Sequence, residues 1–225
     1  MLRILIADDH EVARHGIRAL LEGHAGWEVC AEAKDGREAV ELSISMNPDL
    51  ILLDIGMPNL NGLEAARQIL AASPELPILI LTMLDSDHVV REVLRAGARG
   101  FLLKSDAGRD LVAAVEALQL HRTFFTTRVS QMVLEGFLDR KADGNAPDGK
   151  EKKPEEEAIP VLTGREREVI QLLAEGKTSK EVAVALRLSV KTAETHRTNL
   201  MRKLNLHSVA DLTRYAVRNG IVQVF

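Results

Sequence analysis

Five short aliphatic runs, each followed by an amphipathic stretch, constrain the fold of the first 120 residues more than any other feature. The runs are rich in Ile, Leu and Val, as buried parallel strands are, and Gly, Asn and Pro separate them from the stretches with helical spacing. Five βα units predict a doubly wound α/β fold, with a parallel sheet covered by helices on both faces. We expect strands at 3–7, 28–33, 50–54, 78–82 and 100–104, and helices at 11–22, 36–46, 61–72, 87–96 and 107–120.

The rest of the chain has no comparable strand signal and predicts a separate all-α domain. Residues 126–140 have the spacing of one amphipathic helix, and a polar stretch with three prolines follows, which is typical of a flexible linker. Beyond it we expect four helices at about 164–175, 179–186, 190–204 and 208–219, with Ser or Thr at each N-cap. The expected organisation is a domain at 1–122, a linker helix at 123–140, a flexible linker at 141–160 and a second domain at 161–225.

Charge differs between the two expected domains. The net charge of −4 divides into −7 for residues 1–138, −2 for 139–160 and +5 for 161–225. A basic domain beside an acidic one favours nucleic acid as a partner of the basic one. The single cysteine, Cys30, cannot form an internal disulfide, and acids follow the first apolar run too early for a signal peptide. We therefore expect a cytoplasmic protein without a membrane segment.

Polar side chains gather where the predicted strands end. Asp8 and Asp9 follow the first strand, Asp54 ends the third, Thr82 the fourth and Lys104 the fifth. The carboxyl ends of parallel strands meet at one edge, so these groups should converge. Three carboxylates favour a hard divalent cation such as Mg²⁺, and a metal-bound carboxylate can attack a phosphoryl group. The lysine and the threonine could then stabilise the transferred oxygens.

The same motifs resemble those of receiver domains of two-component signalling, which have a flavodoxin-like fold. The resemblance covers residues 1–120 and rests on DD at 8–9, D-x-x-M-P-x-x-x-G at 54–62, T at 82 and K at 104. It implies that Asp54 is the phosphoacceptor and that Gly56 adds a backbone carbonyl to the Mg²⁺ ligands Asp8, Asp9 and Asp54. It also implies that Thr82 and Phe101 are switch residues. Ser105 follows Lys104 where many receivers have Pro, which leaves the geometry of that peptide bond open.

Residues 178–204 have the pattern of a helix-turn-helix. Stepping 100° per residue along the second helix places Val190, Ala193, Leu200, Met201 and Leu204 on one face. The opposite face holds Lys191, Thr192, Thr195, Asn199 and Arg202. A face with short polar and basic side chains suits the major groove of DNA, although an ordinary surface helix of a small bundle would show a similar pattern.

The segment from Leu162 to Leu204 closely resembles the LuxR/NarL-type DNA-binding module. L-T-x-R-E-x-E-V opens the segment, and V-K-T-x-x-x-H opens the recognition helix. The resemblance implies that Glu194, Thr195 and Thr198 face bases, with Asn199 on the same surface. It implies that phosphates are held mostly by Lys180, Lys191, Thr192, Arg202 and Lys203.

Taken together, the motifs predict a NarL/FixJ-type response regulator. It would accept a phosphoryl group from a sensor histidine kinase, bind promoter DNA as a homodimer on activation, and act with RNA polymerase. It would catalyse only the phosphorylation and dephosphorylation of its own aspartate. The competing class is a Mg²⁺-dependent phosphohydrolase, but Gly56 stands where such enzymes commonly place a proton donor. A constitutive DNA binder with a vestigial receiver is disfavoured by the intact acidic set.

The opposite charges of the two domains suggest how the unphosphorylated protein is inhibited. A linker of about twenty residues gives a millimolar effective concentration, so even a weak contact would be populated. We expect the acidic domain to mask the recognition face of the basic one.

Overall fold

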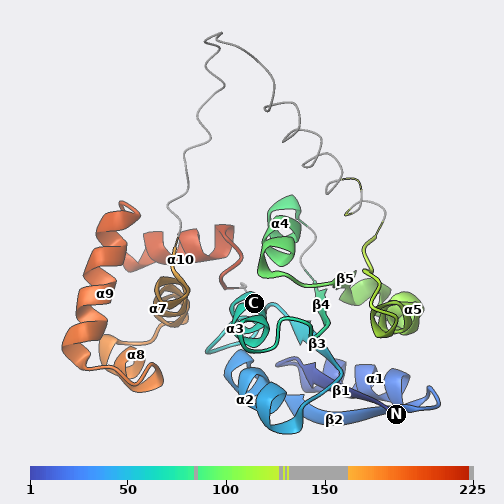
Figure 1. Ribbon diagram of the computed structural model, residues 1–225. Coiled ribbons are helices and arrows are strands. Elements are labelled where there is room, and N and C mark those ends of the chain that lie inside the picture. Colours follow the sequence, from blue (N-terminus) through green and yellow to red (C-terminus); the bar gives the residue numbers. More distant parts are fainter. Residues whose placement is uncertain (84–85, 127–128, 130, 132–161, 223–225) are drawn as a thin grey trace, which may run out of the picture.

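The computed structural model describes residues 1–83, 86–126, 129, 131 and 162–222. The N-terminal domain is a five-stranded parallel sheet in the order β2-β1-β3-β4-β5 (Figure 1). Its strands are β1 (Leu2–Ala7), β2 (Trp27–Ala33), β3 (Leu50–Asp54), β4 (Ile78–Thr82) and β5 (Gly100–Leu103). Its helices are α1 (Glu11–Glu22), α2 (Gly36–Met46), α3 (Gly62–Ala72), α4 (Asp87–Ala96) and α5 (Ala107–Gln119), with a 3₁₀ turn η1 (Lys104–Asp106) after β5.

Two aliphatic layers sandwich this sheet. Alternate residues of the strands pack on one side against α2, α3 and α4, and on the other side against α1 and α5. Strands β3 and β4 are buried along their whole length, which explains their uninterrupted apolar runs. The expected doubly wound α/β fold is confirmed, and every predicted strand and helix of this domain is present.

The chain beyond α5 returns to the sheet before it leaves the N-terminal domain. The backbone N–H of Phe101 donates to the Phe124 carbonyl at 2.9 Å, and the Phe124 N–H donates to Arg99 at 3.0 Å. Residues 123–126 are therefore not helical, and the linker helix expected over 123–140 does not begin at 123. These hydrogen bonds satisfy backbone groups at the free edge of β5. Most of that linker helix and the linker at 141–160 lie outside the described residues.

The C-terminal domain is all-helical, as expected. It consists of α7 (Gly164–Ala174), α8 (Ser179–Ala185), α9 (Val190–Lys203) and α10 (Val209–Arg218). The predicted N-caps are confirmed, because each side-chain oxygen accepts from a backbone N–H of the first turn; they are Thr163, Thr178, Ser189 and Ser208. Gly176 and Gly220 follow α7 and α10 at positive φ, where glycine is favoured.

The C-terminal core is small and aliphatic. Val169, Ile170 and Leu172 of α7 are fully buried and pack against residues from the other three helices. Helix α7 therefore packs against both helices of the predicted helix-turn-helix. None of the helices in the part of the chain that the structure describes has the length and apolarity of a membrane span.

Candidate functional site

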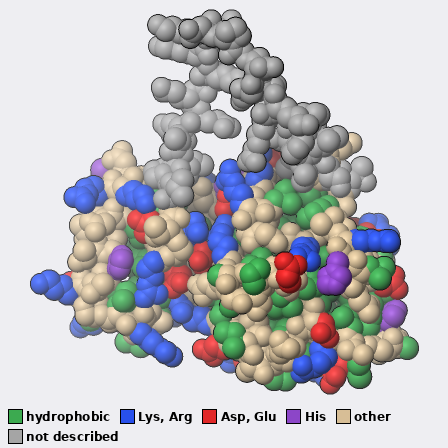
Figure 2. All heavy atoms as spheres, viewed as in Figure 1, with side chains coloured by type: hydrophobic (Ala, Val, Ile, Leu, Met, Phe, Trp, Pro, Cys, Tyr) green, Lys and Arg blue, Asp and Glu red, His purple; other side chains and the backbone are tan. Residues whose placement is uncertain are grey.

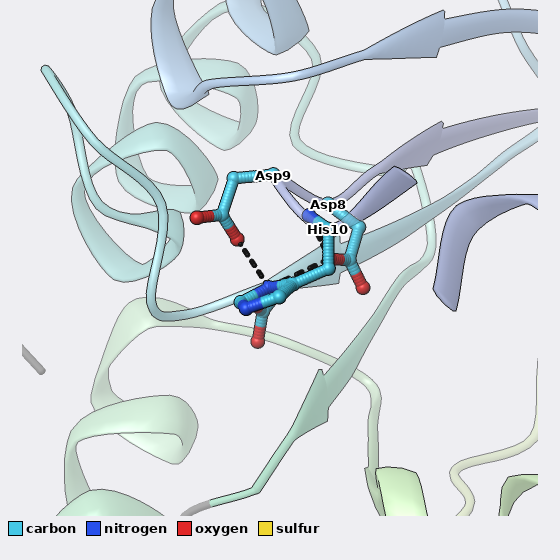
Figure 3. Close-up of side chains that lie close together, drawn as sticks. Asp8, Asp9 and His10 are labelled. Atoms are coloured by element: carbon cyan, nitrogen blue, oxygen red, sulfur yellow. Dashed lines mark hydrogen bonds and ion pairs between the residues drawn. The ribbon is translucent and has the colours of Figure 1, made fainter. Parts of the chain in front are cut away.

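Acidic side chains meet at the carboxyl edge of the N-terminal sheet, as the strand pattern predicted. Asp8 follows β1 and is 1% exposed, and Asp54 ends β3 and is 3% exposed. Asp8, Asp9, His10 and Asp54 each offer a ligand atom, and these atoms lie within 4.8 Å of one another. Figure 3 shows the His10 ring against both aspartates, with Nδ1 2.9 Å from Asp9 Oδ1.

Lys104 bridges two of these carboxylates. Its Nζ lies 2.8 Å from Asp8 Oδ2 and 2.9 Å from Asp54 Oδ2. Burial raises the pKa of Asp54 above its ordinary value, although the lysine opposes this shift. Burial alone would lower the pKa of Lys104, but the two aspartates outweigh it and the pKa is raised. The lysine therefore stays charged, and it holds in place a carboxylate that is costly to ionise.

Two oxygens of the cluster fit a divalent cation. Asp8 Oδ2 and Asp9 Oδ1 are buried and, within the described part of the chain, make no hydrogen bond of regular geometry. Their close partners are Lys104 and His10, through ion pairs. Buried carboxylate oxygens need a partner, and oxygen ligands in such a cluster are what Mg²⁺ prefers. The donor set therefore suits the expected ion.

Thr82 and Phe101 lie on the neighbouring strands β4 and β5. Thr82 is the last residue of β4 and is completely buried. Phe101 of β5 is 2% exposed and pairs in register with Ile80, two residues before Thr82. The structure thus places Thr82 at the carboxyl end of its strand, as the acids are, and Phe101 within the apolar core two residues before the end of β5. Among the described residues, no peptide bond is cis, so the bond after Lys104 is trans.

The segment Ile55–Asn61, called here the β3–α3 loop, turns sharply away from Asp54. The Ile55 N–H donates to Asp54 Oδ1 at 2.8 Å, and the Ile55 carbonyl accepts from Met57 and Gly62 at 3.0 Å each. A Cβ on Gly62 would lie 1.9 Å from the Asp54 carbonyl oxygen, so only glycine fits there. This close approach explains the glycine of the D-x-x-M-P-x-x-x-G motif.

The helix-turn-helix consists of α8 and α9. Arg187 takes a φ of +52° in the turn between them. On α9, Ala193 and Leu200 are buried, and Met201 and Leu204 are half-buried, as the predicted apolar face requires. Val190 is 40% exposed, which corrects its assignment to that face. Val190 is the first residue of α9, and this end of the helix is exposed to solvent.

All nine predicted DNA-contacting side chains are exposed. They are Lys180, Lys191, Thr192, Glu194, Thr195, Thr198, Asn199, Arg202 and Lys203. Figure 2 shows Lys and Arg side chains projecting from the outer edge of this domain, at the left of the view. One of the nine also has an internal role, since Lys203 Nζ lies 2.7 Å from the Glu166 carboxylate of α7.

The two domains contact each other through α7 and the turn after α10. Glu64 of α3 pairs with Arg167 at 2.9 Å, and Gln171 and Ile221 hydrogen-bond to the β3–α3 loop. In Figure 1, α9 lies on the side of its domain that faces away from the sheet. The expectation that the N-terminal domain masks the recognition face is therefore wrong. The charges that pair across the interface lie on α2, α3 and α7, and the net charges of −7 and +5 did not indicate these positions.

Sequence reasoning missed two groups of residues. His10 carried a signal, because it directly follows the acid pair, but it was not assigned to the site. The interdomain residues, Gln171 above all, carried none: it bonds Asn61 across 110 positions of sequence. A helical glutamine is unremarkable in sequence until the packing of the two domains is known.

Comparison with known proteins agrees with this geometry. Residues 4–116 match the family described as response regulator receiver domain, and residues 160–216 match bacterial regulatory proteins of the luxR family. The transcriptional regulatory protein LiaR of Bacillus subtilis (strain 168) is 36% identical over 99% of this chain and 100% of its own length. The transcriptional regulatory protein DegU of Brevibacillus brevis is 31% identical, covering 99% and 96%.

Solved structures extend the similarity to both domains. The RcsB response regulator of Salmonella typhimurium has a TM-score of 0.57 and 27% identity, covering 96% of this chain and 98% of that one. Both halves of the chain and their order are thus accounted for. The chain belongs to the NarL/FixJ-type response regulators, two-component transcriptional regulators that combine a receiver with a LuxR-type DNA-binding domain.

Proposed function

We propose that Asp54 is the phosphoacceptor of this response regulator and that the receiver catalyses its own phosphorylation. The observation that carries the proposal is the convergence of Asp8, Asp54 and Lys104 within ion-pair distance at the end of the sheet. An Asp54 oxygen attacks phosphorus, and the bond from phosphorus to the imidazole nitrogen of a sensor histidine kinase breaks. The products are an aspartyl phosphate and the free histidine.

The surrounding residues have separate roles in this transfer. Asp8, Asp9, Asp54 and the Gly56 carbonyl would hold Mg²⁺, which neutralises charge on the transferred oxygens when it is bound. Lys104 turns from the carboxylates to a phosphoryl oxygen, and the Thr82 hydroxyl donates to another. Thr82 then moves inward and Phe101 follows, which changes the surface of the receiver. Hydrolysis of the acyl phosphate restores the starting state.

The output is regulated transcription from promoter DNA. The exposed face of α9 enters the major groove, with Glu194, Thr195 and Thr198 toward bases and the lysines and arginine on phosphates. RcsB has been solved as dimers bound to DNA, and we propose that phosphorylation likewise promotes a homodimer here. We place the protein in the cytoplasm and expect RNA polymerase as a partner. We propose that the receiver spans residues 1–122 and the DNA-binding domain residues 161–225, and that residues 123–160 connect them.

Intact-mass measurement with acetyl phosphate and Mg²⁺ tests the assignment. Wild type should gain one phosphoryl group, and Asp54→Asn should gain none. Glu75→Gln is the matched control, because it removes an exposed carboxylate (89% exposed) on the same domain; it should gain one group as wild type does. Equal phosphoryl gain by wild type and Asp54→Asn would falsify the assignment.

A further inference from the structure

Gln171 of α7 is buried in the interface between the two domains. The residue is 1% exposed. A buried amide needs partners for both its oxygen and its nitrogen. Gln171 finds two of its three partners in the receiver, so its position is explained by the interface and not by the fold of its own domain.

The two receiver partners of Gln171, Met57 and Asn61, both belong to the β3–α3 loop. Its Oε1 accepts from the Asn61 N–H at 2.8 Å, and its Nε2 donates to the Met57 carbonyl at 3.0 Å. The same Nε2 donates to Glu175 Oε1 at 2.8 Å, and the Glu175 carboxylate in turn accepts from the Asn59 N–H at 3.1 Å. Gln171 therefore contacts both ends of the five-residue stretch Met57–Asn61 and orients the Glu175 carboxylate that holds its middle.

That stretch is directly connected to the phosphoacceptor. Met57 donates to the Ile55 carbonyl, and the Ile55 N–H donates to Asp54 Oδ1. Lys104 engages the other oxygen, so both oxygens of Asp54 are held in this arrangement. A hydrogen bond to a carboxylate oxygen makes that oxygen a weaker nucleophile, so loosening the Ile55 contact favours attack on phosphorus even after Lys104 has turned to a phosphoryl oxygen. The contact from Ile55 moves only with the β3–α3 loop, which also carries Gly56.

Other contacts of the interface hold the domains together without touching the loop. Gln68 Nε2 donates to Glu168 at 3.0 Å, and the same carboxylate lies 3.3 Å from Arg37. Glu64 pairs with Arg167, and Gly164 approaches so closely that a Cβ there would lie 2.5 Å from the Glu64 carboxylate. Docking and control of the loop are thus carried by different residues, so they can be separated by substitution.

We propose that Gln171 is a positioning residue for the phosphorylation site, acting from the DNA-binding domain through the β3–α3 loop. It holds the loop in the arrangement in which Ile55 and Lys104 occupy both oxygens of Asp54, and it thereby slows phosphoryl transfer. The inference rests on the proposed role of Asp54. If it holds, a residue of the DNA-binding domain partly determines how fast the receiver is phosphorylated.

The rate of phosphorylation of the full chain by acetyl phosphate with Mg²⁺ tests the proposal. Gln171→Ala should be phosphorylated about five- to tenfold faster than wild type, because the loop loses two hydrogen bonds that hold it. Gln68→Ala is the matched control: it removes a glutamine bond from the same interface but none from the loop, and its rate should stay within about twofold of wild type. Alanine is a good helix former, so α3 and α7 should both persist.

Amide hydrogen exchange on the same variants distinguishes positioning from simple docking. In Gln171→Ala, exchange should rise at residues 57–62 and stay as in wild type along 164–170 and 64–70. An unchanged rate, or equal acceleration by both variants, overturns the proposal, as does a rise in exchange over the whole interface. A wild type that gains no phosphoryl group, or an Asp54→Asn variant that gains one, removes the proposed function and this inference with it.

Discussion

The acidic site of the receiver and the recognition face of α9 are both polar, but they are built in opposite ways. The acidic site draws Asp8, Asp54, Thr82 and Lys104 from four strand ends and buries all but the lysine almost completely. The recognition face comes from one helix, and its side chains are exposed. Substitution in the first should therefore disturb folding as well as chemistry, whereas substitution in the second should alter binding alone.

The largest expected effect is on stability, at Gly62, where α3 packs directly against the backbone of Asp54. Gly62→Ala should lower the free energy of unfolding by about 3 kcal/mol or more, because the new Cβ would lie 1.9 Å from the Asp54 carbonyl oxygen. Gly108→Ala is the control: it lies in α5 with no atom within 4 Å of the new Cβ, and it should leave stability unchanged or slightly raised. Urea unfolding compares the two, and equal midpoints would show that the β3–α3 loop tolerates displacement.

An intermediate effect is expected on the recognition face, in binding and not in folding. Thr198→Ala should change base preference by about 1–3 kcal/mol at one position if its side chain faces a base. Lys191→Ala should weaken all sequences alike and reduce the salt slope of log K by roughly 0.9. Competition binding over a randomised site measures both, with melting temperature as the check on folding. A changed preferred sequence in Lys191→Ala would contradict the division into base and phosphate contacts.

The same contrast explains what the sequence could predict. Topology alone placed the acids together, because parallel strands deliver their last residues to one edge, so Asp8 and Asp54 could be assigned without coordinates. Periodicity alone placed the polar face of α9, and failed only at Val190, where the helix begins. Both signals are local. The bonds from Gln171 to Asn61 and Met57 join residues more than 100 positions apart, so no local pattern predicts them.

Net charge was the least reliable guide. An acidic receiver and a basic DNA-binding domain suggested a masked recognition helix, yet the ion pairs between the domains join α7 to α2 and α3. Glu168 of the basic domain pairs with Arg37 of the acidic one, the reverse of what the domain charges suggest. Individual ion pairs depend on a few side chains at contact distance, whereas net charge averages over the whole surface.

The smallest effect tests whether Lys203 belongs to the recognition face or to the internal packing. The Glu166 carboxylate closes the capping box of α7 and pairs with Lys203 of α9. Burial tends to raise the pKa of Glu166, but Lys203 and Thr163 outweigh it and the pKa is lowered. Glu166→Gln should lower the free energy of unfolding by about 0.5–1 kcal/mol at neutral pH, since an exposed pair contributes little. Glu181→Gln is the control, because Glu181 closes the same kind of box on α8 with Thr178 as its cap; it should have the smaller effect.

The pH dependence of this difference has a definite sign. A lowered pKa means that the Glu166 carboxylate stabilises the fold above its ordinary pKa of 4.5, and that this contribution is lost as the pH falls through the folded-state value. The difference between wild type and Glu166→Gln should therefore be constant near neutral pH and shrink below about pH 4.5. DNA affinity separates the two roles of Lys203. If it holds a phosphate, Glu166→Gln frees it and affinity should stay equal or rise. A loss of affinity would mean that the ion pair orients α9, and that Lys203 supports the recognition helix instead of touching DNA.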